Sequence, residues 1–546
     1  MAIVTFSKKQ FEKDIGNFNE QMKDRISMFG TPIEREEENE ISIEVFPNRP
    51  DLLSYQGFKR SFLAFLGKKT GLQSYKINKP EKNYVVVVDS SVKDVRPYTA
   101  CAIVRDLNLD NEKIKELIDL QEILHITIGR KRKKAAIGIY PLEKIELPIT
   151  FKALEPDKIK FIPLEMDKEL SGLEILQRHP AGKEYSHLLA GKIKFPIFTD
   201  SREQILSMPP VINSHLTGKI TPDTKDIFVE CSGFDFGVLN TCLNIIVTCM
   251  ADMGGKIYQM ELKGLKKTTP DLAPRSMKIS LENTNKLLGI NINEKQIKQL
   301  LEKMGYDYKN KAVEIPAWRA DILHEVDLIE DVAIAYGYEN FVPEIPKIST
   351  IGAEDSREKI KRSVALILSG LGLLEVSSYH LTSKNNQAEN IDLQEKENAI
   401  EVEASKTEYS VLRNNLSHSL LKIFSENVDS EYPQKIFEIG KVFLDSQGKV
   451  NEKESLSAAL SPGNFTDIKQ TLEYMFRMLG FEISFSEPKN RPQLFIEGRT
   501  AEILLNGKYI GFIGEIHPRI LKNWKIKMPV SLFEISLEEI LRELVK

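Results

Sequence analysis

The sequence predicts a multidomain α+β protein, and three observations lead to this fold class. The chain has 546 residues, which is enough for three to five domains with separate cores. Short apolar strands alternate with helices in one long segment, as in a mixed α/β domain, and long alternating strands with glycine turns fill the last third. We expect domains at 1–83, 84–262, 277–345 and 346–546, with a linker at 263–276.

Composition narrows the class of protein. Charged residues make up 28% and hydrophobic residues 41%, which is ordinary for a globular chain, and the net charge of −4 excludes a uniformly basic nucleic-acid coat. Any RNA contact must therefore come from local basic patches. The sequence lacks a long apolar run and a signal peptide, so we expect a cytoplasmic protein without membrane contact. The four cysteines form no CxxC pair and are expected to be small buried side chains.

The N-terminal domain is predicted from a strand and a helix. In the strand ISIEVF, Ile41, Ile43 and Val45 alternate with other residues, which is the period of a half-buried strand. The segment NRPD then forms an extended turn before a helix. Four aromatic residues at helical spacing predict the core face of that helix: Tyr55, Phe58, Phe62 and Phe65.

The second domain alternates strands with helices. Its strands are predicted at YVVVVD, YTACAIV, AAIGIY, KFPIFT and DIFVEC. One helix is clearly delimited, because Asp235 caps its start and Gly254 follows its end. Five of its apolar residues fall on a predicted buried face: Leu239, Leu243, Ile246, Val247 and Met250.

Two features of this domain suggest binding. A run of five successive cations precedes the AAIGIY strand: Arg130, Lys131, Arg132, Lys133 and Lys134. Such a run is either a solvated turn or a phosphate contact. The segment from Pro209 to Asp235 also gathers polar residues around loops, among them Asn213, Ser214, Thr217, Glu230 and Ser232. Small polar residues ordinarily cap turns, so their chemistry alone leaves both interpretations open.

Residues 277–345 predict a winged-helix-like unit with an acidic helix. Two short helices are separated by the strand-like GININ and followed by a hairpin-like strand, which keeps nucleic-acid binding as an alternative function. A third helix begins near His324, and one of its faces is predicted to be apolar. That face consists of Val326, Ile329, Val332, Ala333 and Tyr336.

Carboxylates lie on the opposite face of this third helix. Asp327, Glu330 and Asp331 are spaced i, i+3 and i+4, so their charges repel one another by roughly 0.2–0.5 kcal/mol per contact. Asp321 precedes the helix and either joins the cluster or caps the first turn. Four oxygen donors suit Mg²⁺, whereas a solvated acidic face is the simpler interpretation of the spacing alone. No nucleophile or base accompanies the cluster, which argues against a free-standing Mg²⁺ hydrolase.

Residues 346–546 predict helices between long strands. Helices are expected at REKIKRSVALILSGLG, SLLKIFSENV and TDIKQTLEYMFRMLG. Strands are expected at EVSSYHL, KIFEIGKVFL, TAEILLNGKYIGFIGEI and SLFEISL. The domain carries no P-loop, no GxGxxG and no Ser/His/Asp spacing, so its sequence predicts no nucleotide site or hydrolase triad of its own.

Six motifs in register resemble the β subunit of phenylalanyl-tRNA synthetase of the archaeal and eukaryotic type. They are NRPDLLSYQG, QEILHITIGRKRKKAAIGIYPL, PPVINSHLTGKITPDTKDIFVECSG, AWRADILHEVDLIEDVAIAYGY, SVLRNNLSHSLLKIFSENV and GRTAEILLNGKYIGFIGEIHP. The resemblance implies a ligase that attaches phenylalanine to its tRNA with ATP. It further implies a heterotetramer of two α and two β chains, in which α binds ATP and carries the aminoacylation site.

The resemblance also implies roles for the domains and for individual residues. The last domain is similar to a degenerate class II synthetase fold with an antiparallel sheet, inactive and structural. The family's Mg²⁺ ligands correspond to Asp321, Asp327, Glu330 and Asp331. The 84–262 domain resembles the editing domain that hydrolyses misacylated tyrosyl-tRNA, with Glu230 at the tyrosine hydroxyl and Asn213, Ser214, Thr217 and Ser232 as further pocket residues. An inactive RNA-binding or scaffold paralogue is the alternative.

Overall fold

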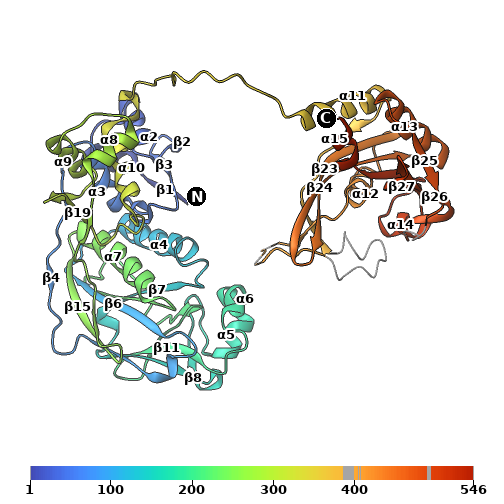
Figure 1. Ribbon diagram of the computed structural model, residues 1–546. Coiled ribbons are helices and arrows are strands. Elements are labelled where there is room, and N and C mark those ends of the chain that lie inside the picture. Colours follow the sequence, from blue (N-terminus) through green and yellow to red (C-terminus); the bar gives the residue numbers. More distant parts are fainter. Residues whose placement is uncertain (1, 385–398, 404, 406, 489–492, 545–546) are drawn as a thin grey trace. The chain divides into compact units, whose positions relative to one another are not determined.

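The computed structural model describes residues 2–384, 399–403, 405, 407–488 and 493–544. These residues form helices and several separate sheets, so the predicted multidomain α+β class is confirmed. The chain divides into two compact units, Met1–Ile345 and Pro346–Lys546 (Figure 1).

Unit 1 begins with a three-stranded antiparallel sheet in the order β1-β3-β2. Ile41, Ile43 and Val45 point into its core, and the aromatic face of α3 is buried against them, as predicted. The rings of Phe58 and Phe62 stack with their centroids 5.1 Å apart. The elements are β1 (Ala2–Ser7), α1 (Lys8–Asp14), α2 (Glu20–Met28), β2 (Ile33–Glu36), β3 (Glu40–Val45) and α3 (Tyr55–Phe65).

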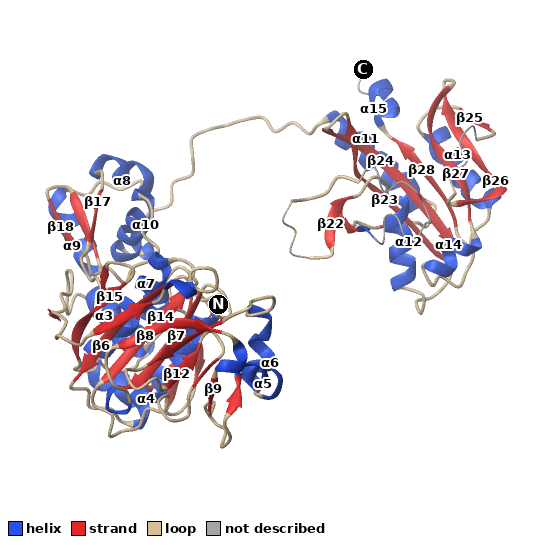
Figure 2. Ribbon diagram, turned by 90° about the horizontal axis from the view of Figure 1, so that it is seen from below, coloured by secondary structure: helices blue, strands red, loops and turns tan. Residues whose placement is uncertain are grey.

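A large, mostly antiparallel sheet follows, whose main path runs β13-β12-β11-β8-β5-β15-β6-β14-β7, with β4 and β16 paired to β15 (Figure 2). A separate two-stranded sheet contains β9 and β10. The strands are β4 (Ile77–Asn78), β5 (Val85–Val88), β6 (Tyr98–Arg105), β7 (Ala135–Pro141), β8 (Ile149–Leu154), β9 (Lys160–Phe161), β10 (Leu170–Ser171), β11 (Phe195–Thr199), β12 (Ile205–Met208), β13 (Ile212–Asn213), β14 (Ile227–Gly233), β15 (Lys256–Lys263) and β16 (Lys267–Thr269).

Helices accompany this sheet, and two of them cover one face of β6, β14 and β7. The helices are α4 (Asn111–Ile126), α5 (Gly172–Arg178), α6 (Pro180–Tyr185) and α7 (Phe236–Asp252). Both α4 and α7 pack on the face of β6, β14 and β7 that carries Ala102, Val229 and Ile137. The Asp235 cap and all five predicted core residues of α7 are confirmed, and the four cysteines are buried and free.

The last part of unit 1 is a small sheet in the order β17-β19-β18, accompanied by three helices. Its elements are β17 (Arg275–Lys278), α8 (Leu281–Leu288), α9 (Glu294–Lys303), β18 (Asp307–Lys309), β19 (Ala312–Ile315) and α10 (Glu325–Tyr336). The strand expected at GININ is wrong, since this segment is a loop. The Asn285 side chain bonds both the N–H and the C=O of Ile292 at 2.9 Å, which replaces a strand partner.

The buried face of α10 differs from the prediction. Val326 is 46% exposed, whereas Asp331 on the expected outer face is only 4% exposed. A buried carboxylate is tolerable where cations and donors surround it, and Asp331 has both, as described below. The helix therefore turns part of its acidic face inward.

Unit 2 is built on a seven-stranded sheet in the order β20-β23-β24-β28-β27-β26-β25, antiparallel except for β20 and β23. A two-stranded sheet pairs β21 with β22. The strands are β20 (Leu374–Glu375), β21 (Leu381–Ser383), β22 (Tyr409–Leu412), β23 (Gln434–Ser446), β24 (Lys449–Ser461), β25 (Ile483–Ser486), β26 (Phe495–Leu505), β27 (Lys508–Ile516) and β28 (Ser531–Ser536).

Helices cover both faces of this sheet. The cores contain α11, α13 and α15 on one face and α12 and α14 on the other. The helices are α11 (Ser356–Gly370), α12 (Ser417–Glu426), α13 (Phe465–Met478), α14 (Pro518–Asn523) and α15 (Glu538–Leu544). The strand expected at EVSSYHL is largely irregular, because its middle residues bond to side chains: the Ser378 N–H and Oγ donate to Glu438.

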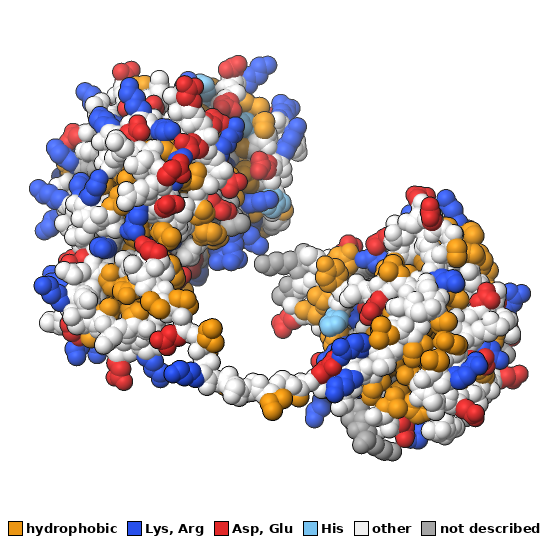
Figure 3. Space-filling view, turned by 90° about the horizontal axis from the view of Figure 1, so that it is seen from above, with side chains coloured by type: hydrophobic (Ala, Val, Ile, Leu, Met, Phe, Trp, Pro, Cys, Tyr) orange, Lys and Arg blue, Asp and Glu red, His pale blue; other side chains and the backbone are white. Residues whose placement is uncertain are grey.

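None of the helices among the described residues combines the length and apolar character that a membrane crossing requires. In Figure 3, hydrophobic side chains gather on the lobe of unit 1 from which the connecting segment departs. Leu287, Val326 and Tyr338 are exposed in this region. They line a groove between α8 and α10.

Candidate functional site

Glu230 lies at the centre of β14, between β6 and β7. It faces Cys101 on one neighbouring strand and Gly138 on the other, and it is only 2% exposed. A Cβ at Gly138 would lie 2.6 Å from Glu230 Oε1 and 2.2 Å from Tyr140 Oη, closer than atoms pack. Glycine at this position therefore makes the room in which the carboxylate and the phenol meet.

Tyr140 connects Glu230 to the end of β13. Its hydroxyl lies 3.4 Å from Glu230 Oε1 and 3.2 Å from Asn213 Oδ1, and it can donate its one proton to only one of them at a time. The other carboxyl oxygen, Glu230 Oε2, is buried and has no hydrogen-bond partner among the described residues. An unpaired buried acceptor is costly, so this oxygen is free to accept a further hydrogen bond.

Burial raises the pKa of Glu230 to about 8, against the opposing effects of the Arg96 guanidinium and of the nearby Tyr140 and Ser232 hydroxyls. At neutral pH the carboxyl is therefore mostly protonated. A protonated carboxyl group both donates and accepts a hydrogen bond, which suits a phenol that does the same. Arg96 is itself held by Ser232, whose Oγ accepts from its Nε at 3.1 Å.

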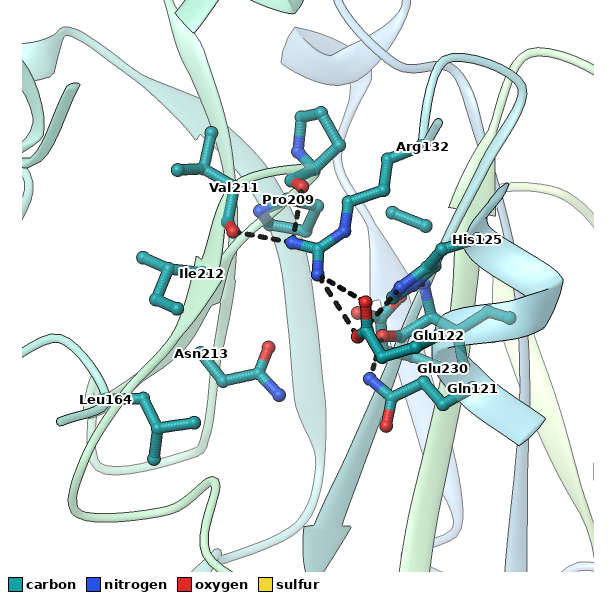
Figure 4. Close-up of a pocket in the computed structure, with 13 residues that line it drawn as sticks. Gln121, Glu122, His125, Arg132, Leu164, Pro209, Val211, Ile212, Asn213 and Glu230 are labelled. Carbon is teal, nitrogen blue, oxygen red and sulfur yellow. Dashed lines mark hydrogen bonds and ion pairs between the residues drawn. The ribbon is translucent and has the colours of Figure 1, made fainter. Parts of the chain in front are cut away.

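A pocket of about 100 Å³ opens beside Glu230. Figure 4 shows Asn213, Ile212 and Leu164 on one side and Gln121, His125 and Glu230 on the other. Its volume is of the same order as the roughly 150 Å³ cavity that admits a benzene ring. Apolar walls with a few polar groups directed inward are typical of small-molecule sites, so the pocket suits an aromatic side chain with one polar substituent.

One wall of the pocket is a partly buried network of His125, Glu122 and Arg132. The Ile137 N–H donates to His125 Nε2 at 2.8 Å, so the imidazole proton resides on Nδ1, 3.2 Å from Glu122 Oε1. Burial lowers the pKa of His125, which keeps the ring neutral. Arg132 donates to both Glu122 oxygens, at 3.1 and 3.2 Å, and to the Val211 carbonyl at 2.9 Å (Figure 4). The network joins α4 to the loop that carries Asn213.

The structure separates the predicted loop residues by role. Asn213 lines the pocket and Ser232 lies beside Glu230 on the same face of β14. Ser214 instead caps its own turn, accepting from the Leu216 N–H at 3.3 Å, and Thr217 donates to the Leu206 carbonyl at 3.4 Å. These two side chains are buried and serve the loop, as small polar residues in turns ordinarily do.

The basic run forms a tight turn between α4 and β7. Arg130, Lys131 and Arg132 have φ values of 47°, 53° and 62°, which non-glycine residues seldom adopt in succession. The Arg132 N–H donates to the His125 carbonyl at 3.1 Å, which helps to hold this conformation. Arg132 points into the pocket wall, while the other four cations remain exposed. The run is therefore divided between a structural residue and a charged surface.

Sequence reasoning missed the pocket residues Gln121 and His125, the neighbouring Tyr140, and the inward role of Arg132. Their signal was present only in part: Gly138 and Tyr140 sit two residues apart in a strand, which places both on the face of Glu230 once the register is known. Nothing local distinguishes an inward arginine from its neighbours in a run of five.

The acidic helix is organised by Arg319. This buried guanidinium donates to Asp321 at 2.8 and 2.6 Å and to Asp331 at 2.8 Å, and the Tyr306 hydroxyl also donates to Asp331. Asp327 accepts from the N–H groups of Leu323 and His324 at 2.7 and 2.8 Å, and so caps α10. Three of the four predicted metal ligands are thus bonded within the chain.

The four carboxylates nevertheless influence one another. Burial, followed by Asp331, Asp327 and Asp321, raises the pKa of Glu330. Among the described residues, no group of three or more His, Cys, Asp or Glu side chains is arranged to hold a metal ion. The donor chemistry still fits a hard cation, because the oxygens are all carboxylates and the described residues supply Glu330 with no hydrogen-bond donor.

Two family comparisons cover the second half of the chain. Residues 277–338 match the tRNA synthetase B5 domain. Residues 342–537 match the phenylalanyl tRNA synthetase beta chain CLM domain.

Curated relatives match nearly the whole length of the chain. The phenylalanine–tRNA ligase beta subunit of Thermococcus sibiricus is 42% identical over 502 residues, which cover 90% of this chain and 89% of the relative. That of Pyrococcus furiosus is 40% identical over 507 residues, with 91% and 90% coverage. The Archaeoglobus fulgidus subunit is 37% identical over 548 residues, with 98% coverage of both chains.

A solved structure resembles unit 1. It is an N-terminal fragment of the phenylalanyl-tRNA synthetase beta subunit from Pyrococcus horikoshii, with a TM-score of 0.59 and 38% sequence identity. The likeness covers 61% of this chain and 99% of that one.

Proposed function

The chain belongs to the family of phenylalanine–tRNA ligase β subunits, as its six motifs predicted, and we propose that it works with an α subunit that carries the aminoacylation site. Family membership implies both the α partner and a phenylalanine tRNA. The proposed assembly contains two α and two β chains in the cytoplasm, where ATP is bound by α. Unit 2, a class II-like sheet domain, would then be an inactive structural partner.

The further proposed activity is hydrolysis of tyrosine wrongly attached to the phenylalanine tRNA. A hydrophobic pocket for phenylalanine cannot strongly reject a side chain that merely adds a hydroxyl, with discrimination of about a hundredfold. A second site that recognises the tyrosine hydroxyl can hydrolyse the wrongly formed ester. The single observation that carries this proposal is the buried, unpaired Oε2 of Glu230 beside a pocket suited to an aromatic ring.

In this pocket, selectivity comes from the Glu230 carboxyl group. A tyrosyl hydroxyl pairs with Oε2, whereas a phenylalanyl ring would leave that oxygen buried without a partner, at a cost of roughly 1–3 kcal/mol. Asn213, which lines the pocket, and Ser232, two residues from Glu230 on β14, remain proposed pocket residues. Ser214 and Thr217 would contribute indirectly, by holding the loop that carries Asn213.

The test is deacylation of tyrosyl-tRNA and phenylalanyl-tRNA by the heterotetramer. We expect the tyrosyl ester to be hydrolysed much faster, and pyrophosphate exchange to require the α subunit. Equal hydrolysis of both esters would refute the editing proposal, and exchange by this chain alone would refute the inactive role of unit 2.

RNA contact is proposed for the exposed part of the basic turn. Arg130, Lys131, Lys133 and Lys134 present their charges to solvent close to the pocket, where the acceptor end of a tRNA must arrive for editing. Phosphate contacts supply most of the non-specific affinity for nucleic acid. Arg132 is left out of this proposal, because its guanidinium is already bonded to Glu122 and Val211.

Mg²⁺ is proposed at the acidic helix, with Glu330 as the principal ligand and Asp321, Asp327 and Asp331 contributing charge or remaining oxygens. When bound, the cation would offset the mutual repulsion of the carboxylates and strengthen contact with the α subunit. The scaffold or RNA-binding paralogue is the weaker alternative, because a chain without chemistry has no use for an unpaired buried carboxyl oxygen in a pocket.

A further inference from the structure

The strand β1 forms an unprotected sheet edge. The order β1-β3-β2 leaves one side of β1 without a strand partner in the part of the chain that the structure describes. Sheet edges are usually blocked by charged residues or proline, because exposed edges pair with other chains. The strand AIVTFS contains neither, and Ile3 is 52% exposed.

The free edge has backbone groups available for pairing. The Lys8 N–H donates to the Asn39 carbonyl, so Lys8 bonds toward β3. Residues of an antiparallel strand bond alternately to one side and the other. Val4 and Phe6 therefore bond toward β3, while Ile3 and Thr5 direct their N–H and C=O groups toward the free edge.

A groove of about 530 Å³ runs along this edge, and residues of α4 line its opposite wall. Five successive residues of β1, from Ile3 to Ser7, line it. Because successive side chains of a strand point to opposite faces, five in a row line a groove only where the strand presents its edge. The unpaired backbone groups thus face an open channel.

The groove is strongly acidic. Its lining includes six carboxylate residues and two lysines: Glu40, Asp110, Glu112, Glu116, Asp119, Glu122, Lys113 and Lys115. Glu116 bonds to Gln56 and Glu122 to Arg132, but Glu40, Glu112 and Asp119 are exposed. Such a surface repels nucleic acid and attracts cationic side chains.

We propose that this groove binds a basic, extended segment of a partner protein, which adds to the sheet as a strand beside β1. Main-chain hydrogen bonds to Ile3 and Thr5 would supply affinity, and lysine or arginine at alternate positions would face the acidic wall of α4. A second copy of β1 is a poorer occupant, because its six residues carry no cation.

The test uses a labelled ten-residue peptide in which lysine alternates with valine and threonine, titrated by fluorescence anisotropy against the full-length chain. A matched peptide carries glutamate in place of lysine. We expect the lysine peptide alone to bind, with slower amide exchange at Ile3 and Thr5. Equal affinity for both peptides, or unchanged exchange at these amides, would overturn the proposal.

Two sets of variants separate the backbone from the charge. Thr5→Pro removes an edge N–H at a position where proline is tolerated, and it should weaken binding at least tenfold, whereas Thr5→Val should not. The double change Glu112→Lys and Asp119→Lys should also weaken binding at least tenfold, and this pair decides the matter if Thr5→Pro fails to fold. Unchanged affinity in the double variant would overturn the proposal. So would a dimer of the full-length chain that Thr5→Pro abolishes, because the edge would then bind a second copy of β1.

Discussion

Gly138 lies directly opposite Glu230 across the β7–β14 pair, and its missing side chain is what allows the carboxylate to lie beside the Tyr140 hydroxyl. The close approach explains why a buried acid can sit at the floor of a pocket. It also provides a way to disturb the site without touching any polar group.

The substitution Gly138→Ala should displace Tyr140 and Glu230, because an added Cβ would meet both at less than 3 Å. We expect tyrosyl-tRNA deacylation to fall about tenfold or more, with a stability loss of roughly 1–3 kcal/mol from overpacking. Attachment of phenylalanine by the heterotetramer is the control and should be unaffected. Unchanged deacylation would mean that the reacting ester lies elsewhere.

Glu230→Ala should change selectivity as well as rate. Losing the carboxyl removes the partner of the tyrosyl hydroxyl and also the penalty for a phenylalanyl ring, so the preference for the tyrosyl ester should shrink by roughly tenfold or more. Single-turnover deacylation of the two esters measures this ratio. A purely structural glutamate would lower both rates together and leave the ratio unchanged.

Glu230 should also make stability depend on pH. Its pKa of about 8 lies above the ordinary value of 4.5, so the folded chain holds a proton that the unfolded chain has lost between these values. The contribution of this group to the free energy of unfolding is therefore highest below pH 4.5. It falls by about 1.4 kcal/mol per pH unit as the pH rises toward 8. Glu230→Gln should flatten this slope.

The two tryptophans make that measurement possible, because Trp318 lies in unit 1 and Trp524 in unit 2. In a Trp524→Phe background, fluorescence during urea unfolding reports on unit 1 alone. Phenylalanine should be tolerated there, since the buried Trp524 Nε1 has no hydrogen-bond partner among the residues that the structure describes. An identical pH slope with and without Glu230→Gln would contradict the raised pKa.

The acidic helix should respond differently to two similar substitutions. Glu330→Gln removes a carboxylate without a described donor, so it should weaken Mg²⁺-dependent assembly with α and relieve repulsion without Mg²⁺. Asp331→Asn breaks contacts to Arg319 and Tyr306, so it should destabilise the chain by roughly 3–5 kcal/mol even with a chelator. Sizing at low concentration, with and without chelator, separates the two effects. A heterotetramer indifferent to Mg²⁺ in the parent chain would refute the metal role.

Salt dependence should identify the RNA-contacting cations. Replacing Lys131, Lys133 and Lys134 by alanine should reduce the slope of log affinity against log salt by about 2 to 3 for phenylalanine tRNA. Arg132→Ala is the matched change within the same turn and should leave the slope nearly unaltered, because its guanidinium is bonded to Glu122. A larger change in slope for Arg132→Ala than for the triple variant would reverse this assignment.

Much of the fold followed from local patterns in the sequence. The aromatic face of α3, the apolar face of α7 and the alternation in β3 repeat with the period of their elements, so a short window of residues is enough to recognise them. The spacing of Asp327, Glu330 and Asp331 on α10 was visible for the same reason, whereas the role of Glu230 was suggested only by the family resemblance.

The arrangement of the candidate site could not be predicted in this way, because it depends on contacts between residues that are far apart in the sequence. Tyr140 and Glu230 meet because β7 pairs with β14 in one register, and a shift by one residue would place them on opposite faces. Arg132 turns inward because its guanidinium pairs with Glu122 on the preceding helix. Asp331 can be buried because Arg319 and Tyr306 donate hydrogen bonds to its carboxylate. Periodicity specifies which element forms, but the burial of a charge depends on the partners that the packed chain brings to it, and these are set by tertiary structure alone.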